Sequence, residues 1–77
     1  MDMKNLIHMA NQIGGFFEAM PDREEALLGI SGHLHNFWEP RMRKQLLAYV
    51  DAEDGKELKP IVVSAIRAHR NKLSPQH

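Results

Sequence analysis

The stretch HLHNFWEPRMR, residues 33–43, decides how this chain folds, because a proline interrupts a helical pattern there. Proline lacks a backbone N–H and ends a helix, but it is well tolerated at the first position of the next one. We therefore predict that one helix, about residues 23–38, ends here and that another begins at Pro40. Glu39, just before the proline, is expected to act as a carboxylate cap of that next helix.

Similar signals divide the rest of the chain. Asp2 is a suitable N-cap for a first helix over roughly residues 3–20, which Pro21 ends. Asp22 followed by Glu25 is a capping-box variant that opens the second helix. Each of the first two helices therefore has a start signal and a stop signal.

The second half of the chain contains a polar turn between two further helices. The sequence DAEDGKE, residues 51–57, follows the third helix, and Pro60 can open a fourth. The β-branched run at 61–63 could form a strand, but the i, i+4 spacing of apolar residues up to Leu73 favours a helix. The last residues, SPQH, are expected to fray.

All four predicted helices carry an apolar face, because apolar residues recur at steps of three and four. Since no two segments alternate convincingly as strands, we expect a single all-α domain over residues 1–77, a small bundle of about four short helices. The expected inward-facing residues are Leu6, Met9 or Ala10, Ile13, Phe16, Phe17, Met20, Ala26, Leu27, Ile30, Leu34, Phe37, Trp38, Met42, Leu46, Tyr49, Val50, Ile61, Val62, Ala65, Ile66, His69 and Leu73.

Length and composition narrow the class of protein. A 77-residue chain has at most a marginally stabilising core. The absence of cysteine excludes disulfides, thiolate metal sites and cysteine nucleophiles, and it favours a reducing cytoplasm. No apolar run approaches the ~20 residues of a membrane span, and the N-terminus lacks a signal-peptide pattern, so we expect a cytoplasmic protein without a membrane partner. Ten basic residues balance ten acidic ones, so net charge does not attract nucleic acid.

Four glycines fall inside predicted helices, where each costs about 0.5–1 kcal/mol relative to alanine. They are Gly14, Gly15, Gly29 and Gly32. Glycine removes the side chain that keeps two helix axes apart, so we expect another helix to approach closely. That helix could belong to the same bundle or to a partner.

The residues around Pro40 predict a partner-binding surface. Arg41, Arg43 and Lys44 fall in the first turn of the third helix, where the macrodipole disfavours cations by about 0.3–1 kcal/mol. They could pair with carboxylates of a partner or with phosphates, or they could form a solvated basic turn. Trp38 could pack in the core or anchor a partner, since tryptophan and arginine are enriched at binding hot spots. We predict that Trp38, Arg41 and Arg43, supported by Phe37, bind a partner.

The histidines do not suggest a metal or catalytic site. His33 and His35 are two residues apart, so on a helix they diverge by about 200° and cannot share an ion. His35 and Glu39 have a suitable four-residue step, but the other histidines are scattered. No nucleophile elbow or glycine-rich phosphate loop is present. No catalytic, cofactor-binding or metal-ligating residue is therefore predicted.

Nucleic-acid binding is a weaker alternative. The basic segments PRMRK (40–44) and RAHRNK (67–72) favour it. The acidic segments DREE (22–25) and DAEDGKE, together with the zero net charge, oppose it.

Three segments of the chain resemble the delta subunit of NAD-dependent, molybdenum-containing formate dehydrogenase. They are MANQIGGFFEAMP (9–21), GISGHLHNFWEPRMRKQLLAYVD (29–51) and LKPIVVSAI (58–66). The most specific part is the block HLxxFWxPRMR, and the resemblance extends from about residue 6 to 70.

This resemblance implies a small accessory subunit without a redox centre. In that family the large catalytic subunit holds the molybdenum cofactor and iron–sulfur clusters, and the delta subunit docks on it to support assembly, cofactor maturation or stability. A chaperone that binds the immature enzyme only transiently is a second alternative. When isolated, the chain could form a homodimer through the surface that it otherwise gives its partner.

Overall fold

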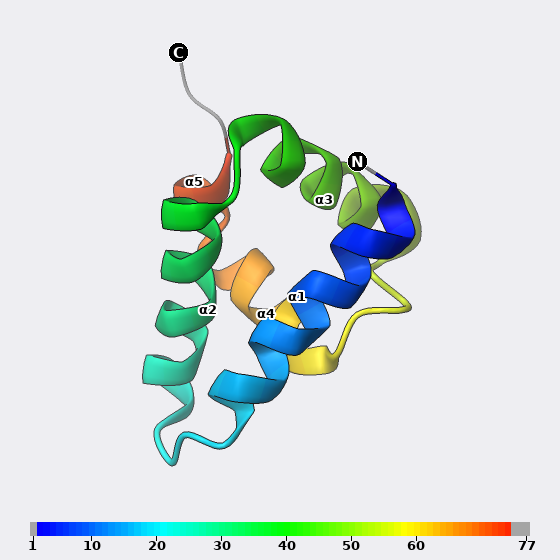
Figure 1. Ribbon diagram of the computed structural model, residues 1–77. Coiled ribbons are helices and arrows are strands. Elements are labelled where there is room, and N and C mark those ends of the chain that lie inside the picture. The colour runs from blue at the N-terminus through cyan, green and yellow to red at the C-terminus, as the bar shows by residue number, and fades with distance from the viewer. Residues whose placement is uncertain (1, 75–77) are drawn as a thin grey trace.

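Five helices make up the part of the chain that the computed structural model describes, residues 2–74 (Figure 1). They are α1 (Met3–Glu18), α2 (Arg23–Phe37), α3 (Pro40–Glu53), α4 (Pro60–Ala68) and α5 (Arg70–Leu73). No strand occurs in these residues, and the predicted small all-α bundle is confirmed. None of these helices is long and apolar enough to cross a membrane. The expected fraying of residues 75–77 lies outside the described residues.

The first two helices begin where the sequence predicts. The Asp2 carboxylate accepts a hydrogen bond from the Lys4 backbone N–H at 3.3 Å. The Asp22 carboxylate accepts from the backbone N–H groups of Glu24 and Glu25, at 2.9 and 3.3 Å. A helix leaves its first amide groups without an internal partner, so both aspartates act as N-caps.

The predicted carboxylate cap and the predicted end of the third helix are both wrong. Glu39 occupies the N-cap position of α3, but its side chain makes no capping hydrogen bond. Pro40 at the start of α3 lacks an N–H and already has a helical φ, so the helix begins without such a cap. α3 then continues through residues 51–53 of the predicted turn. It ends where Asp54 and Gly55 adopt the left-handed conformation, with φ of 61° and 64°.

The predicted fourth helix is interrupted at His69, so the segment from Pro60 to Leu73 forms two helices. His69 has φ −125° and ψ 37°, outside the helical region. Beyond this break, Leu73 is buried, and Arg70 makes two hydrogen bonds with Asp51 of α3, at 3.0 and 2.7 Å. These tertiary contacts stabilise α5 in a direction that helical periodicity alone does not predict.

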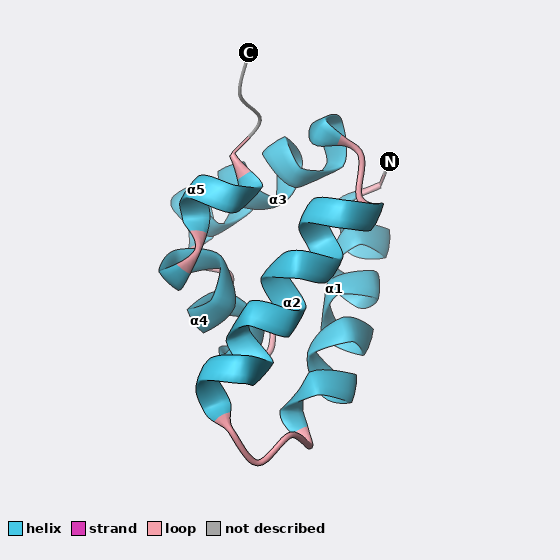
Figure 2. Cartoon of the chain, turned by 90° about the vertical axis from the view of Figure 1, so that its left-hand side faces the viewer, coloured by secondary structure: helices cyan, strands magenta, loops and turns pink. Residues whose placement is uncertain are grey.

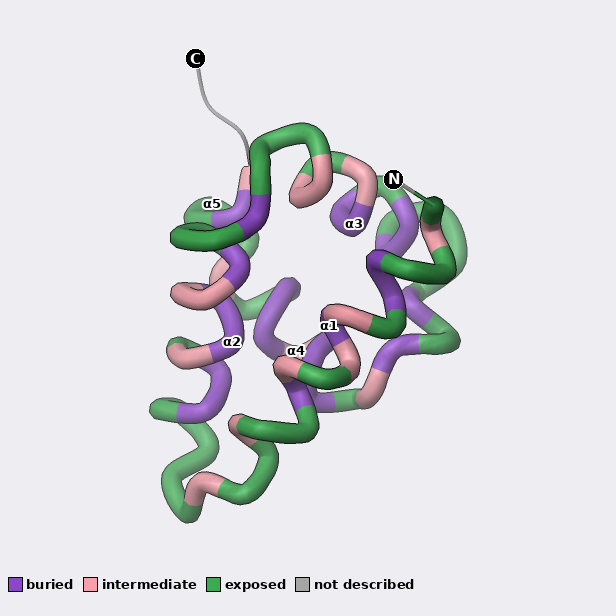
Figure 3. The backbone as a smooth tube through the Cα atoms, viewed as in Figure 1, coloured by how far each residue is buried: buried purple, intermediate pink, exposed green. Residues whose placement is uncertain are grey.

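α2 is the central helix of the bundle. It contacts α1 on one side and α4 and α5 on the other, as the view from the α2 side shows (Figure 2). α1 also packs against α3 and α4, and the buried residues face the space between the helices (Figure 3). The core consists of Leu6, Ile7, Ala10, Ala26, Leu27, Ile30, Leu34, Trp38, Leu46, Leu47, Tyr49, Val50, Leu58, Ile61, Val62, Ala65, Ile66 and Leu73.

Most of the predicted inward-facing residues are buried or half-buried, but Phe16 and Phe37 are 74% and 72% exposed. The prediction is wrong for these two. Neighbouring residues can both be buried in this bundle, as Leu46 and Leu47 are, so the packing of the other helices decides which ring of each pair turns inward. Phe17 and Trp38 take the inward positions: the Phe17 ring lies over Gly29, and Trp38 is in the core.

The helical glycines divide into two groups. A β-carbon at Gly14 would overlap Val62 of α4, and one at Gly29 would overlap the Phe17 ring. These two glycines are therefore explained by close packing inside the bundle. A β-carbon at Gly32 would have no atom within 4 Å, and one at Gly15 would meet only the Lys59 side chain, at 3.7 Å. Internal packing does not explain this second pair.

Candidate partner-docking surface

The chain leaves α2 at Trp38 and turns into α3; residues 37–43 are called the α2–α3 corner. The backbone of Trp38 leaves the helical conformation, with φ −94° and ψ 138°, while its N–H still donates to the Leu34 carbonyl at 3.1 Å. The indole is only 5% exposed. Of the two roles that the sequence leaves open for Trp38, this placement supports core packing.

Arg43 caps the C-terminal end of α2 with side-chain hydrogen bonds. Its Nη1 donates hydrogen bonds to the carbonyl oxygens of His35 at 2.8 Å and of Trp38 at 3.2 Å. The last carbonyls of a helix lack internal partners and carry the negative end of the macrodipole, so a guanidinium is favourable there. The unfavourable position of Arg43 at the start of α3 is thus compensated by the end of the preceding helix.

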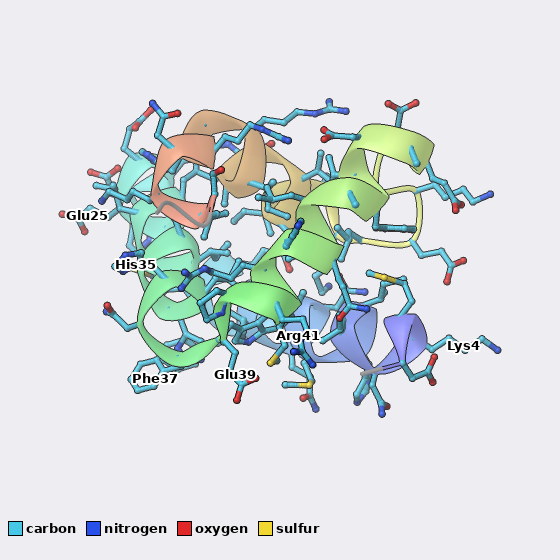
Figure 4. All side chains as sticks on the ribbon, turned by 90° about the horizontal axis from the view of Figure 1, so that it is seen from above. Lys4, Glu25, His35, Phe37, Glu39 and Arg41 are labelled. Atoms are coloured by element: carbon cyan, nitrogen blue, oxygen red, sulfur yellow. The ribbon has the colours of Figure 1, made fainter. Side chains whose placement is uncertain are left out.

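Arg41 and Lys44 differ from Arg43. Both are exposed, and neither forms an ion pair or hydrogen bond with any residue from 2 to 74. Figure 4 shows Arg41 on the same side of the molecule as Glu39 and Phe37, the side on which α1 lies. The corner therefore presents an exposed aromatic ring, an exposed carboxylate and a cation that is unpaired within residues 2–74.

A groove between α1 and α2 adjoins this corner. The His33 ring at its edge lies 4.8 Å from the Phe37 ring, measured between centroids, at an interplanar angle of 42°. The groove and the corner therefore form one continuous surface. The groove has a volume of about 370 Å³ and is lined by Gln12, Ile13, Phe16, Phe17 and His33.

Sequence reasoning missed this groove, although a signal was present. Met9, Ile13 and Phe16 recur at steps of four and three, which places them on one flank of α1. Phe16 is exposed and the other two are half-buried. From the sequence alone, these residues cannot be distinguished from the core-facing residues of the same helix, because both sets are apolar and helically spaced. Only the position of α2 shows which residues are covered.

The two histidines before the corner face different surroundings. His33 lines the groove, whereas His35 is exposed, with its Nδ1 3.2 Å from the Asn36 side-chain oxygen. Glu39 lies beyond the end of α2, so its four-residue separation from His35 is not a helical one. Across residues 2–74, no three histidine or carboxylate side chains are grouped as metal ligands would be.

Most of the chain, including the corner and the groove, matches a known family. The family described as "NADH-dependant formate dehydrogenase delta subunit FdsD" matches residues 5–66 of the 77-residue chain. The chain belongs to this family. The predicted resemblance to the delta subunit is confirmed, and the matched region includes the whole α2–α3 corner and every residue that lines the groove. No curated protein and no solved structure matches the chain.

Proposed function

We propose that this delta subunit is a non-catalytic accessory subunit of a cytoplasmic, NAD-dependent formate dehydrogenase complex. It docks on the large molybdenum-containing catalytic subunit, supports its assembly, cofactor maturation or stability, and holds no cofactor itself. The α2–α3 corner is the docking surface. Phe37 and Arg41 contact the partner, whereas Trp38 and Arg43 act from inside by holding the corner in shape.

The observation that carries this proposal is the exposed Phe37 ring on the same side as Arg41 (Figure 4). Neither side chain contributes to the core, and Arg41 has no partner within residues 2–74. Aromatic rings and arginine are the residue types enriched in protein interfaces, where burial of the ring and pairing of the guanidinium provide much of the affinity. An 8.8 kDa chain that exposes both together suits a subunit held by a larger protein.

Several arginines of the basic segments that favour nucleic-acid binding already have partners within the chain. Arg70 pairs with Asp51 at 2.7 Å, and Arg67 pairs with Asp54 at 3.5 Å. Arg43 donates to backbone carbonyls. Because phosphate binding depends on free cations gathered on one face, these contacts favour a protein partner over nucleic acid.

Co-purification tests the proposal. A tagged catalytic subunit is co-expressed with the wild-type delta subunit or with the Phe37→Ala/Arg41→Ala double variant. We expect the wild type to be retained in stoichiometric amount and the double variant to be lost, with helicity unchanged by circular dichroism. Unchanged complex yield, metal loading and formate oxidation with the double variant would contradict the docking role of the corner. Lys72→Ala, a change of another exposed cation outside the corner, is the control.

The same preparations separate the alternatives. A delta subunit present only on the immature catalytic subunit would indicate a transient chaperone. Salt-sensitive retention on heparin without a stable protein partner would indicate a nucleic-acid-binding module. Light scattering of the isolated chain measures any homodimer, which would form through the surface that otherwise contacts the catalytic subunit.

A further inference from the structure

The groove between α1 and α2 exposes apolar surface that the fold does not use. Phe16 is exposed at the groove, and Ile13 and Phe17 line it while half-buried. The remaining lining residues, Gln12 and His33, are polar but carry no fixed charge. Contiguous apolar surface of this kind, with a few polar groups at its edge, is typical of a site that binds apolar side chains.

We propose that this groove receives an amphipathic helix of the catalytic subunit, with apolar side chains against Ile13 and Phe16 and a carboxylate beside Arg41. The inference rests on the proposed function and deepens it, because it names the secondary structure and the chemistry of the segment that binds. It also extends the docking surface from the α2–α3 corner to α1.

The walls of the groove favour a helix over an extended strand. Both walls are helices, whose backbone N–H and C=O groups are already paired along most of their length. No sheet edge exists within residues 2–74. A strand buried there would leave its own backbone groups without partners, whereas a helix pairs them internally. The flank of α1, with Met9, Ile13 and Phe16 at steps of four and three, matches the spacing of an opposing apolar helix face.

The charges of the α2–α3 corner, which adjoins the groove, favour an acidic side chain in the bound helix. Arg41 is exposed, without an ion pair in residues 2–74, and it lies on the same side as Phe37, whose ring contacts His33 of the groove. Covering a guanidinium without a counter-charge is costly, so a partner carboxylate is expected beside it. Glu39 lies on that side as well and would repel a carboxylate placed over it, so the partner's acid is expected beside Arg41 and not beside Glu39.

A second copy of the chain is the competing occupant, and the dimensions count against it. A stable interface of ~800 Å² per partner would take about a sixth of the 4876 Å² surface of this chain. The groove has only five lining residues, against the roughly 20–30 residues per side of such an interface. A helix of a large subunit can fill the groove while neighbouring parts of that subunit cover the corner.

Two matched substitutions and a cross-link test the inference in the co-expressed complex. Phe16→Gln removes the exposed ring at the groove, and Leu28→Gln removes an exposed apolar side chain that does not line it. Arg41→Glu and Lys44→Glu form a second pair, which separates a local contact from a change in net charge. Circular dichroism checks that each variant is folded. A photoreactive residue in place of Gln12 identifies what lies in the groove.

We expect Phe16→Gln and Arg41→Glu to weaken retention by the catalytic subunit at least about tenfold, and Leu28→Gln and Lys44→Glu to leave it nearly unchanged. The cross-linked peptide should come from the catalytic subunit and carry acidic and apolar residues at helical spacing. If the wild type binds and Phe16→Gln binds equally well, the inference fails while the proposed function stands. If the wild type does not bind the catalytic subunit, both fail. A cross-link between two delta subunits, with partner retention unaffected by Phe16→Gln, would assign the groove to a homodimer and overturn the inference.

Discussion

Arg43 and Arg41 occupy similar places in the sequence but should contribute very differently to stability. Arg43 donates to the His35 and Trp38 carbonyls at the end of α2, whereas Arg41 is exposed and has no partner within residues 2–74. Methionine retains a long apolar stem and removes the charge and the donors. We therefore predict that Arg43→Met destabilises the isolated chain and that Arg41→Met does not.

The magnitude for Arg43 follows from three contributions. A hydrogen bond from a charged donor stabilises by about 1.5–3 kcal/mol, and one Nη1 serves both carbonyls, so we count roughly one such bond. The favourable position at the C-terminal end of α2 adds about 0.3–1 kcal/mol. Against this, the Nε of Arg43 is buried without a partner in residues 2–74, which costs about 1 kcal/mol. The net loss on Arg43→Met is therefore about 2 kcal/mol.

Unfolding of the isolated chain, followed by circular dichroism with heat and with urea, measures this difference. For a domain of this size, a loss of about 2 kcal/mol lowers Tm by roughly 8–16 °C. Arg41→Met should change the free energy of unfolding by less than about 0.5 kcal/mol. Equal effects of the two substitutions would refute the reasoning. So would a change below about 0.5 kcal/mol for Arg43→Met, because water would then satisfy the end of α2 as well as the guanidinium does.

Two further pairs of substitutions separate packing from exposure. Trp38→Ala should lower the free energy of unfolding by about 3–5 kcal/mol and leave the isolated chain largely unfolded, whereas Phe37→Ala should change it by less than about 0.5 kcal/mol. Near-ultraviolet circular dichroism and urea unfolding measure both effects. A folded Trp38→Ala chain of native stability would contradict the core role of Trp38. Gly14→Ala should destabilise by about 1–3 kcal/mol, because its β-carbon would overlap Val62, whereas Gly32→Ala should stabilise by about 0.5–1 kcal/mol. The urea midpoints of these two variants should therefore move in opposite directions.

The positions of the helices could be predicted from local signals because those signals act through the backbone. Asp2 and Asp22 satisfy the first amides of their own helices, and Pro40 and Pro60 stand where a missing N–H is harmless. The break at His69 could not be predicted in this way. It accompanies tertiary contacts of α5, which no periodicity within the segment encodes.

The proposed docking surface could be predicted only in part, because the sequence presents neighbouring residues of similar chemistry and only packing decides which of them turns inward. The three cases are the pairs Phe16–Phe17, Phe37–Trp38 and Arg41–Arg43. In each, the second member contacts the core or the end of α2, and the first member is exposed. The exposed members lie at the groove and the adjoining corner, because α1 and α2 are side by side. Substitution of the outward member of each pair should therefore impair binding without impairing folding, and substitution of the inward member should lower the stability of the fold itself.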